Sequence, residues 1–175
     1  MNSLDPSLFI GSSTEGLPIA YALQVELDEE CEPLVWRQSV FGPTATTISA
    51  LLERAENSDF AALVFTPDDS VVSRAAEDAV ARDNVIFELG LFLGALGPRR
   101  VFIVHPRNQQ LRLPSDLAGV TCLTYKSHRK DQNLQAAIGP AATAIRNRIA
   151  TEGLRLGGRH CSLRHRSNRT GRVRS

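Results

Sequence analysis

The sequence predicts an α/β domain built on a five-stranded parallel sheet with helices on both faces. Short apolar runs alternate with segments of helical spacing, which is the pattern of repeated strand–helix units. Residues 60–65 are apolar throughout, as a central parallel strand should be. The 175 residues suffice for one domain with a substantial core. Because crossovers between parallel strands are right-handed, a sheet of this size favours the flavodoxin-like order 2-1-3-4-5.

The first strand is expected at residues 7–10, where an apolar run ends at Gly11. A helix follows over residues 15–27, and Pro18 suits its first turn because the N–H that proline lacks has no partner there. The second strand is expected at residues 34–37.

The second helix is expected at residues 48–55, with Thr46 or Thr47 as its N-cap, and the strand at 60–65 follows it. Residues 71–81 have a mixed composition that fits either a surface helix or a loop.

The third helix is expected at residues 85–96 and ends before Gly97. Gly90 and Gly94 are four residues apart, which indicates close packing of this helix against the sheet or another helix. The fourth strand is expected at residues 100–105.

The last strand is expected at residues 121–125, and a closing helix at 134–150 with Leu134 as the first inward-facing residue. Pro140 lies inside that helix, where it predicts a kink or a short break.

Glu88 is the only charged residue in the apolar helix at 85–96. A helix that is apolar all round is normally buried, and a buried carboxylate is costly unless it is paired or used. A capping box is excluded, because with Asn84 as the N-cap the required position holds a phenylalanine. Three interpretations stay open: attraction to the positive end of the helix, an ion pair with Arg82 or Arg74, and a functional site.

Two other polar segments follow strands that the predicted order makes neighbours. Gly11, Ser12 and Ser13 form a turn that can cradle a phosphate or ribose, although an ordinary connecting loop has the same composition. Asp68 and Asp69 follow the third strand, where open α/β sheets bind ligands, although they fit a polar turn equally well. Both segments are expected to meet near the start of the Glu88 helix, which makes a shared crevice the stronger interpretation. His105 ends the fourth strand, as a ligand contact or as a simple strand-end polar group.

Charge divides the chain into two parts. Residues 1–152 hold 13 basic and 19 acidic residues, a net charge of 13 − 19 = −6, whereas residues 153–175 hold seven arginines and no acid. The first part is expected to be the domain and the second a basic, disordered tail. The acidic domain argues against nucleic-acid binding, which only the tail could support. The tail could also be an out-of-frame remnant.

Cysteine usage points to reduced thiols and a cytoplasmic protein. The three cysteines are widely spaced, and no signal peptide or membrane-spanning run is evident. The domain has no close pair of cysteine or histidine ligands, so no metal is expected there. His160, Cys161 and His165 of the tail are a weak alternative.

Three runs of sequence resemble the bacterial TIR-like family. They are residues 9–17, residues 64–69 and, most specifically, the Arg-Asp-Asn-Val-Ile-Phe-Glu-Leu-Gly run of residues 82–90. The resemblance spans residues 8–150 and implies a flavodoxin-like TIR fold with NAD+ glycohydrolase activity. NAD+ would be the substrate, with no cofactor, and the products would be nicotinamide and ADP-ribose or a cyclic form. Glu88 matches the family's catalytic glutamate.

The resemblance also suggests which residues bind NAD+. Asn84 stands where many TIR NADases have serine or cysteine, which is interpreted as this subfamily's version of the motif and assigns no role to Asn84. Residues 38–47 match the TIR loop that moves on assembly, and Trp36 or Phe41 could stack on a base, although Trp36 also fits the core. The residues expected to bind the nucleotide are Gly11, Ser12, Ser13, Phe41, Asp68, Asp69, Arg82 and Asn84.

Family members act as effector domains in cyclic-nucleotide-triggered anti-phage systems, where they assemble with other TIR domains and are fused to sensor domains. Nothing after Glu152 has the pattern of a sensor domain, so a stand-alone subunit, a truncated effector and a partner-activated domain all fit. Two other functions stay open: a non-catalytic TIR assembly module and a nucleoside deoxyribosyltransferase-like enzyme. A receiver domain fits less well, because Asp68 and Asp69 follow a proline in a loop.

Overall fold

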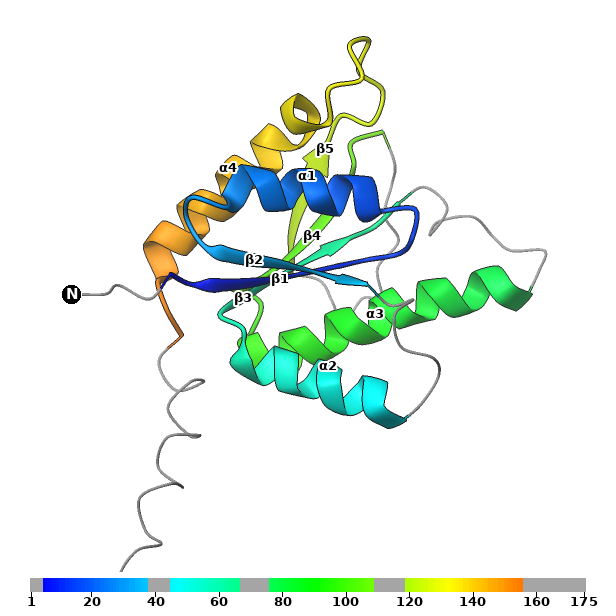
Figure 1. Ribbon diagram of the computed structural model, residues 1–175, viewed down its shortest axis with the longest axis vertical. Helices are drawn as coiled ribbons and strands as arrows, with labels where there is room; N and C mark the ends of the chain where they lie inside the picture. Colours follow the sequence, from blue (N-terminus) through cyan, green and yellow to red (C-terminus); the bar gives the residue numbers. More distant parts are fainter. Residues whose placement is uncertain (1–4, 38–44, 67–75, 109–118, 156–175) are drawn as a thin grey trace, which may run out of the picture.

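The computed structural model describes residues 5–37, 45–66, 76–108 and 119–155. Five parallel strands form one sheet in the order β2-β1-β3-β4-β5, which confirms the predicted fold class and strand order (Figure 1). Along the chain the elements are β1 (Ser7–Ser12), α1 (Leu17–Leu27), β2 (Glu32–Arg37), α2 (Ala45–Asn57), β3 (Phe60–Val64), α3 (Ala76–Leu96), β4 (Val101–Pro106), β5 (Thr121–Tyr125) and α4 (Leu134–Glu152).

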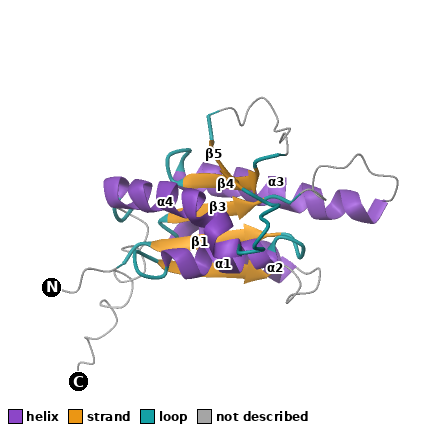
Figure 2. Cartoon of the chain, turned by 90° about the horizontal axis from the view of Figure 1, so that it is seen from above, coloured by secondary structure: helices purple, strands orange, loops and turns teal. Residues whose placement is uncertain are grey.

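Helices cover both faces of the sheet, α1 and α4 on one face and α2 and α3 on the other (Figures 1 and 2). Successive residues of the strands alternate between two apolar cores. Leu8 and Ile10 of β1 belong to the core under α1 and α4, whereas Phe9 belongs to the core under α2 and α3. Strand β3 is apolar at every position because both of its faces are covered.

Strand β1 is longer than predicted, because it continues through Gly11 to Ser12. Gly11 pairs with Trp36 of β2 and with Leu63 of β3, so the strands on both sides hold it in extended conformation. The turn expected at Gly11 and Ser12 is therefore wrong, and the β1–α1 connection begins at Ser13.

Helix α2 begins at Ala45, which places Thr46 and Thr47 in its first turn and makes the predicted N-cap wrong. Helix α3 begins at Ala76, nine residues before the expected start, because residues 76–82 are mostly good helix formers. Asn84 is therefore no N-cap, Arg82 lies within the helix and not at its entrance, and Glu88 is far from the first turn.

Gly90 and Gly94 lie on the exposed side of α3, and a Cβ at either position would meet nothing within 4 Å. The prediction that they pack closely against a neighbour is therefore wrong.

Helix α4 continues without interruption past Pro140, so the predicted break is absent. The side chain of Asn133 caps this helix by accepting a hydrogen bond from the N–H of Ala136 at 2.9 Å. Leu134 is 37% exposed and does not face the core as expected. Among the helices of the described ranges, none is both long and apolar enough to cross a bilayer.

Candidate functional site

Buried hydroxyl groups gather where β1 and β3 end. Ser12 pairs with Val64 across the two strands, and beyond this pair the Ser13 and Thr66 hydroxyls lie 3.4 Å apart. All three side chains are at most 4% exposed. The Ser12 hydroxyl has no hydrogen-bond partner among the described residues. Two segments far apart in sequence thus form one polar edge, as the predicted topology required.

Glu88 reaches this edge from α3. The buried stripe of that helix includes Val85, Leu89 and Phe92, and Glu88 belongs to the same stripe, with 4% exposure. The rings of Phe92 and Phe9 stack with centroids 4.2 Å apart. Because α3 runs antiparallel to β1, moving one turn back from Phe92 to Glu88 corresponds to moving two residues forward in the strand, from Phe9 to Gly11.

Gly11 leaves the space that the Glu88 carboxylate occupies. A Cβ built on Gly11 would lie 3.1 Å from Glu88 Oε2, 2.7 Å from Leu63 Cδ1 and 3.0 Å from Phe9 Cε1. The carboxylate therefore rests against the β1 backbone at the carboxyl edge of the sheet. There it can face a ligand bound beside the buried serines.

Gly16 is a further residue of this edge that the sequence reasoning missed. A Cβ on Gly16 would lie 3.1 Å from Ser12 Cβ and 3.3 Å from Thr66 Cγ2, so its absence lets the β1–α1 turn close over the hydroxyl groups. Its N–H donates to the carbonyl of Ser13 at 3.1 Å. The sequence feature that could have identified Gly16 is its position directly before the first helix.

The other predicted site residues are only partly described. Phe41, Asp68 and Asp69 lie outside the described residues, as does Arg74. Arg82 and Asn84 lie in α3, but their side chains are outside the described part. The proposed contacts of these six residues, including an ion pair of Arg74 or Arg82 with Glu88, stay predictions.

The surroundings of Trp36 and His105 favour a structural role for both side chains over a ligand contact. Trp36 is half-buried against the core under α2 and α3, with its ring centroid 6.1 Å from that of Phe9. This position favours the core interpretation over base stacking. His105 is 8% exposed, and its Nδ1 lies 3.1 Å from the carbonyl of Pro106 at the end of β4. It fits a strand-end polar group.

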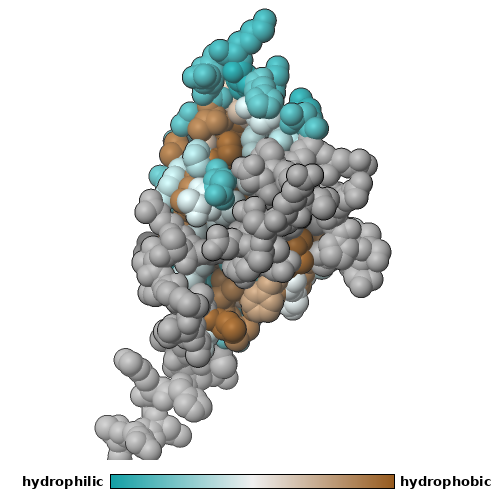
Figure 3. Space-filling view, turned by 90° about the vertical axis from the view of Figure 1, so that its right-hand side faces the viewer, coloured by the Kyte–Doolittle hydropathy of each residue, from teal (hydrophilic) through white to brown (hydrophobic). Residues whose placement is uncertain are grey.

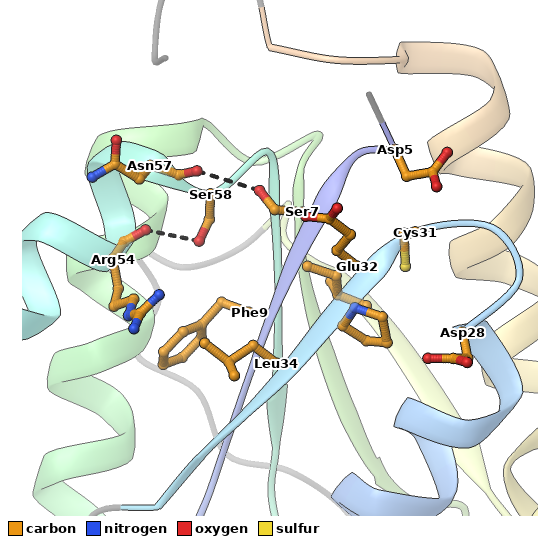
Figure 4. Close-up of a pocket in the computed structure, with 12 residues that line it drawn as sticks. Asp5, Ser7, Phe9, Asp28, Cys31, Glu32, Leu34, Arg54, Asn57 and Ser58 are labelled. Carbon is orange, nitrogen blue, oxygen red and sulfur yellow. Dashed lines mark hydrogen bonds between the residues drawn. The ribbon is translucent and has the colours of Figure 1, made fainter. Parts of the chain in front are cut away.

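A hollow of about 520 Å³ lies at the opposite, amino edge of β1 and β2 (Figure 4). Carboxylates of Asp5, Asp28 and Glu32 line it on one side and Arg54 on the other. Burial, followed by the nearby acids, raises the pKa of Cys31 in this hollow to about 12, so its thiol stays protonated and is no nucleophile.

A second hollow, of about 390 Å³, lies at the β5–α4 connection. Its lining includes the basic residues Lys126, His128, Arg129 and Lys130, of which Arg129 already pairs with Asp131 at 2.6 Å. The described surface at the top of Figure 3 is hydrophilic. Neither hollow includes Glu88. Among the described residues, no three histidine, cysteine or acidic side chains are grouped to hold a metal ion.

The fold and the buried carboxylate define a flavodoxin-like α/β domain with a candidate site at the carboxyl edge of β1 and β3. Residues 7–127 match the family model described as CAP12/Pycsar effector protein, TIR domain. The chain therefore belongs to this family of bacterial TIR domains, as the sequence resemblance predicted.

Three relatives illustrate the similarity. The chain is 39% identical to the Pycsar effector protein PaPycTIR of Pseudomonas aeruginosa over 79% of this chain and 46% of that protein. It is 38% identical to BcPycTIR of Burkholderia cepacia over 83% of this chain and 48% of that protein. It is 42% identical to the CD-NTase-associated protein 12 of Flavobacterium daejeonense over 65% of this chain and 36% of that protein. The chain thus spans about half the length of the Pycsar relatives.

Proposed function

We propose that this domain is an NAD+ glycohydrolase in which Glu88 stabilises the ribose as it becomes cationic. The observation that carries the proposal is the placement of one buried carboxylate against Gly11, at the edge where β1 and β3 end. Membership of the TIR family supports the same activity.

The chemistry needs little from the protein beyond such a carboxylate. The bond between C1′ of the ribose and the nicotinamide nitrogen breaks, and the electron pair neutralises the pyridinium as nicotinamide leaves. Water then adds to C1′ and loses a proton, which gives ADP-ribose. The ribose passes through an oxocarbenium-like state that a nearby carboxylate stabilises, most strongly where water is excluded.

The buried hydroxyl groups supply the polar contacts that such a ligand requires. The Ser12 hydroxyl is 2% exposed and has no hydrogen-bond partner within the described ranges, so a ribose hydroxyl or phosphate oxygen could satisfy it. Ser13, Thr66 and the backbone of Gly11 would complete this part of the site. Arg82, Asn84, Asp68, Asp69 and Phe41 are the further residues predicted to contact the nucleotide.

The biological role that we propose is that of an effector in anti-phage defence. The relatives are named Pycsar effector proteins and CD-NTase-associated proteins, which suggests activation within a system that senses cyclic nucleotides. Assembly with other TIR domains is part of this proposal. It is supported by apolar side chains on α2 and α3 that are about half exposed, namely Ile48, Leu52 and Phe87.

Substitution of Glu88 tests the activity. Concentrated protein is incubated with NAD+, and nicotinamide and ADP-ribose are followed by chromatography. Loss of a preorganised charge at the reacting centre typically lowers turnover about 10²–10³-fold, and we expect this for Glu88→Gln and Glu88→Ala. Glu53→Gln, on the exposed side of α2, is the matched control and should keep wild-type turnover.

Wild-type turnover by Glu88→Gln would remove Glu88 from the reaction. Absence of NAD+ loss in the wild type, tested both concentrated and assembled, would favour the non-catalytic assembly module.

A further inference from the structure

Arg155, just beyond α4, joins the ends of two other helices. Its guanidinium donates one hydrogen bond to the carbonyl of Glu56 in α2 at 2.6 Å and another to the carbonyl of Ala95 in α3 at 3.0 Å. In Figure 1 the segment that leaves α4 runs beneath the sheet towards these helix ends. One side chain thus bridges the two helices that cover the Glu88 face of the sheet.

These carbonyls are groups that helices leave without partners. The last four carbonyls of a helix have no intrahelical donor, and a cation near them is favoured by the helix dipole. Helix α3 has no basic residue of its own in its last turn. Arg155 supplies that positive charge from a distant part of the chain.

Buried Asp59 fixes the backbone of Arg155. The N–H of Arg155 donates to Asp59 Oδ1 at 2.7 Å, while Asp59 Oδ2 accepts from the N–H of Ser7 at 2.8 Å. Asp59 is 2% exposed and directly precedes β3. The start of β1, the start of β3 and the ends of α2 and α3 are therefore tied to one point, here called the Arg155 clasp.

Helix α3 connects the clasp to the candidate site. Ala95 is two turns beyond Glu88, and Phe92, stacked on Phe9, lies between them. The axial position of α3 over β1 thus decides where the Glu88 carboxylate meets Gly11. We infer that Arg155 is a positioning residue for Glu88: the clasp sets the register of α3 on β1. This inference rests on the proposed function where it concerns turnover.

The test compares Arg155→Gln and Arg155→Lys with Arg99→Gln as the control. Arg99 is an exposed arginine that binds Glu152 of α4 at 2.6 Å, and among the described residues its side chain makes no hydrogen bond or ion pair with α2 or α3. Amide hydrogen exchange is measured along α3, and kcat and KM for nicotinamide release are measured separately. We expect faster exchange from Leu89 to Leu96 in Arg155→Gln and a fall in kcat of about tenfold or more with little change in KM, because misplacement by ~1 Å can cost ~10²-fold. Arg155→Lys, which keeps the charge, should recover part of both, and Arg99→Gln should change neither.

The two measurements separate the possible failures. Unchanged exchange in Arg155→Gln would overturn the clasp itself. Faster exchange with unchanged kcat would overturn its role in positioning Glu88. If the wild type releases no nicotinamide, the proposed function fails together with that role, and the exchange data alone decide whether Arg155 holds α3.

Discussion

Gly11 and Glu88 form the two sides of one contact at the candidate site. The glycine pairs with strands on both sides, and the atom that it lacks would lie within 3.1 Å of a carboxylate oxygen, a leucine methyl and an aromatic ring. Three neighbours from three elements crowd this point, so no single rotamer change can make room. The choice of glycine therefore follows from close packing, because its backbone is ordinary extended strand.

Gly11→Ala is predicted to affect stability and activity together. Overpacking in a buried site typically costs about 1–3 kcal/mol, and the displaced carboxylate should lower nicotinamide release. Unfolding in urea and NAD+ turnover measure the two effects. Gly90→Ala is the control, because its Cβ enters open space on a helix and should stabilise the fold by about 0.5–1 kcal/mol. Equal stability of Gly11→Ala and wild type would contradict the close contact.

The sequence was enough to single out the Glu88 carboxylate as a candidate site residue, but the residues that surround it were harder to predict. A helix that is apolar all round is normally buried, so burial of its one acid was expected, although Phe87 and Gly90 of the same helix are exposed. By contrast, the extension of β1 through Gly11 depends on pairing with residues 36 and 63, which are remote in sequence. Gly16 and Thr66 become neighbours only once the turn has closed.

Helix α3 begins before its predicted start, whereas α4 lacks the break that was predicted inside it. Helix α3 begins earlier because charged residues such as Glu77 and Arg82 are good helix formers, although they break the apolar pattern. Helix α4 continues past Pro140 because its buried stripe, which includes Ile138 and Ile145, packs against α1 and the sheet. Tertiary packing thus offsets the local cost of the proline, which alone predicted a kink or a short break in the helix.

Replacing Pro140, which destabilises helix α4 locally, should stabilise the protein. Pro140 is exposed, so Pro140→Ala loses little packing, and it restores the N–H that the carbonyl of Ala136 lacks. The gain is partly offset by greater freedom of the unfolded chain, so we expect a net increase of about 1–2 kcal/mol in unfolding free energy. Urea denaturation measures it, with exposed Ala150→Gly as a reference of opposite sign. A loss of stability in Pro140→Ala would mean that the ring has a packing role.

At the scale of the whole molecule, the sheet order brings distant segments together. Right-handed crossovers together with the size of the sheet favoured an order in which β1 and β3 are neighbours, and hence a candidate site at their shared edge. No comparable rule predicts the contacts of the Arg155 clasp. The clasp joins Ser7, Asp59, Ala95 and Arg155 through hydrogen bonds, and isolated polar residues carry no periodic pattern from which such contacts could be predicted.

Global stability should depend on alkaline pH through Cys31. Burial, followed by neighbouring acids, raises the pKa of this thiol to about 12 in the folded protein, from 9.0 in the absence of the fold. The contribution of the protonated Cys31 thiol to the unfolding free energy is fully present below pH 9. Between pH 9 and 12 the thiol loses its proton in the unfolded chain but keeps it in the folded protein. Unfolding free energy should therefore fall with rising pH, by up to about 1.4 kcal/mol per pH unit from this one group.

Cys31→Ala isolates that contribution from tyrosines and lysines that titrate in the same range. Urea unfolding of both proteins at pH 8, 9, 10 and 11, under reducing conditions, gives two curves. Cys31→Ala loses a small buried side chain and the Sγ contact to the carbonyl of Leu27 at 3.4 Å, so it should be the less stable protein at pH 8. Above pH 9 the wild type loses unfolding free energy because its unfolded chain ionises at Cys31, whereas the variant has no thiol at this position. The curves of unfolding free energy for the two proteins should therefore converge as the pH rises. Parallel curves would show that the folded thiol ionises as readily as the unfolded one, which requires water to reach Cys31 through the hollow at the amino edge of the sheet.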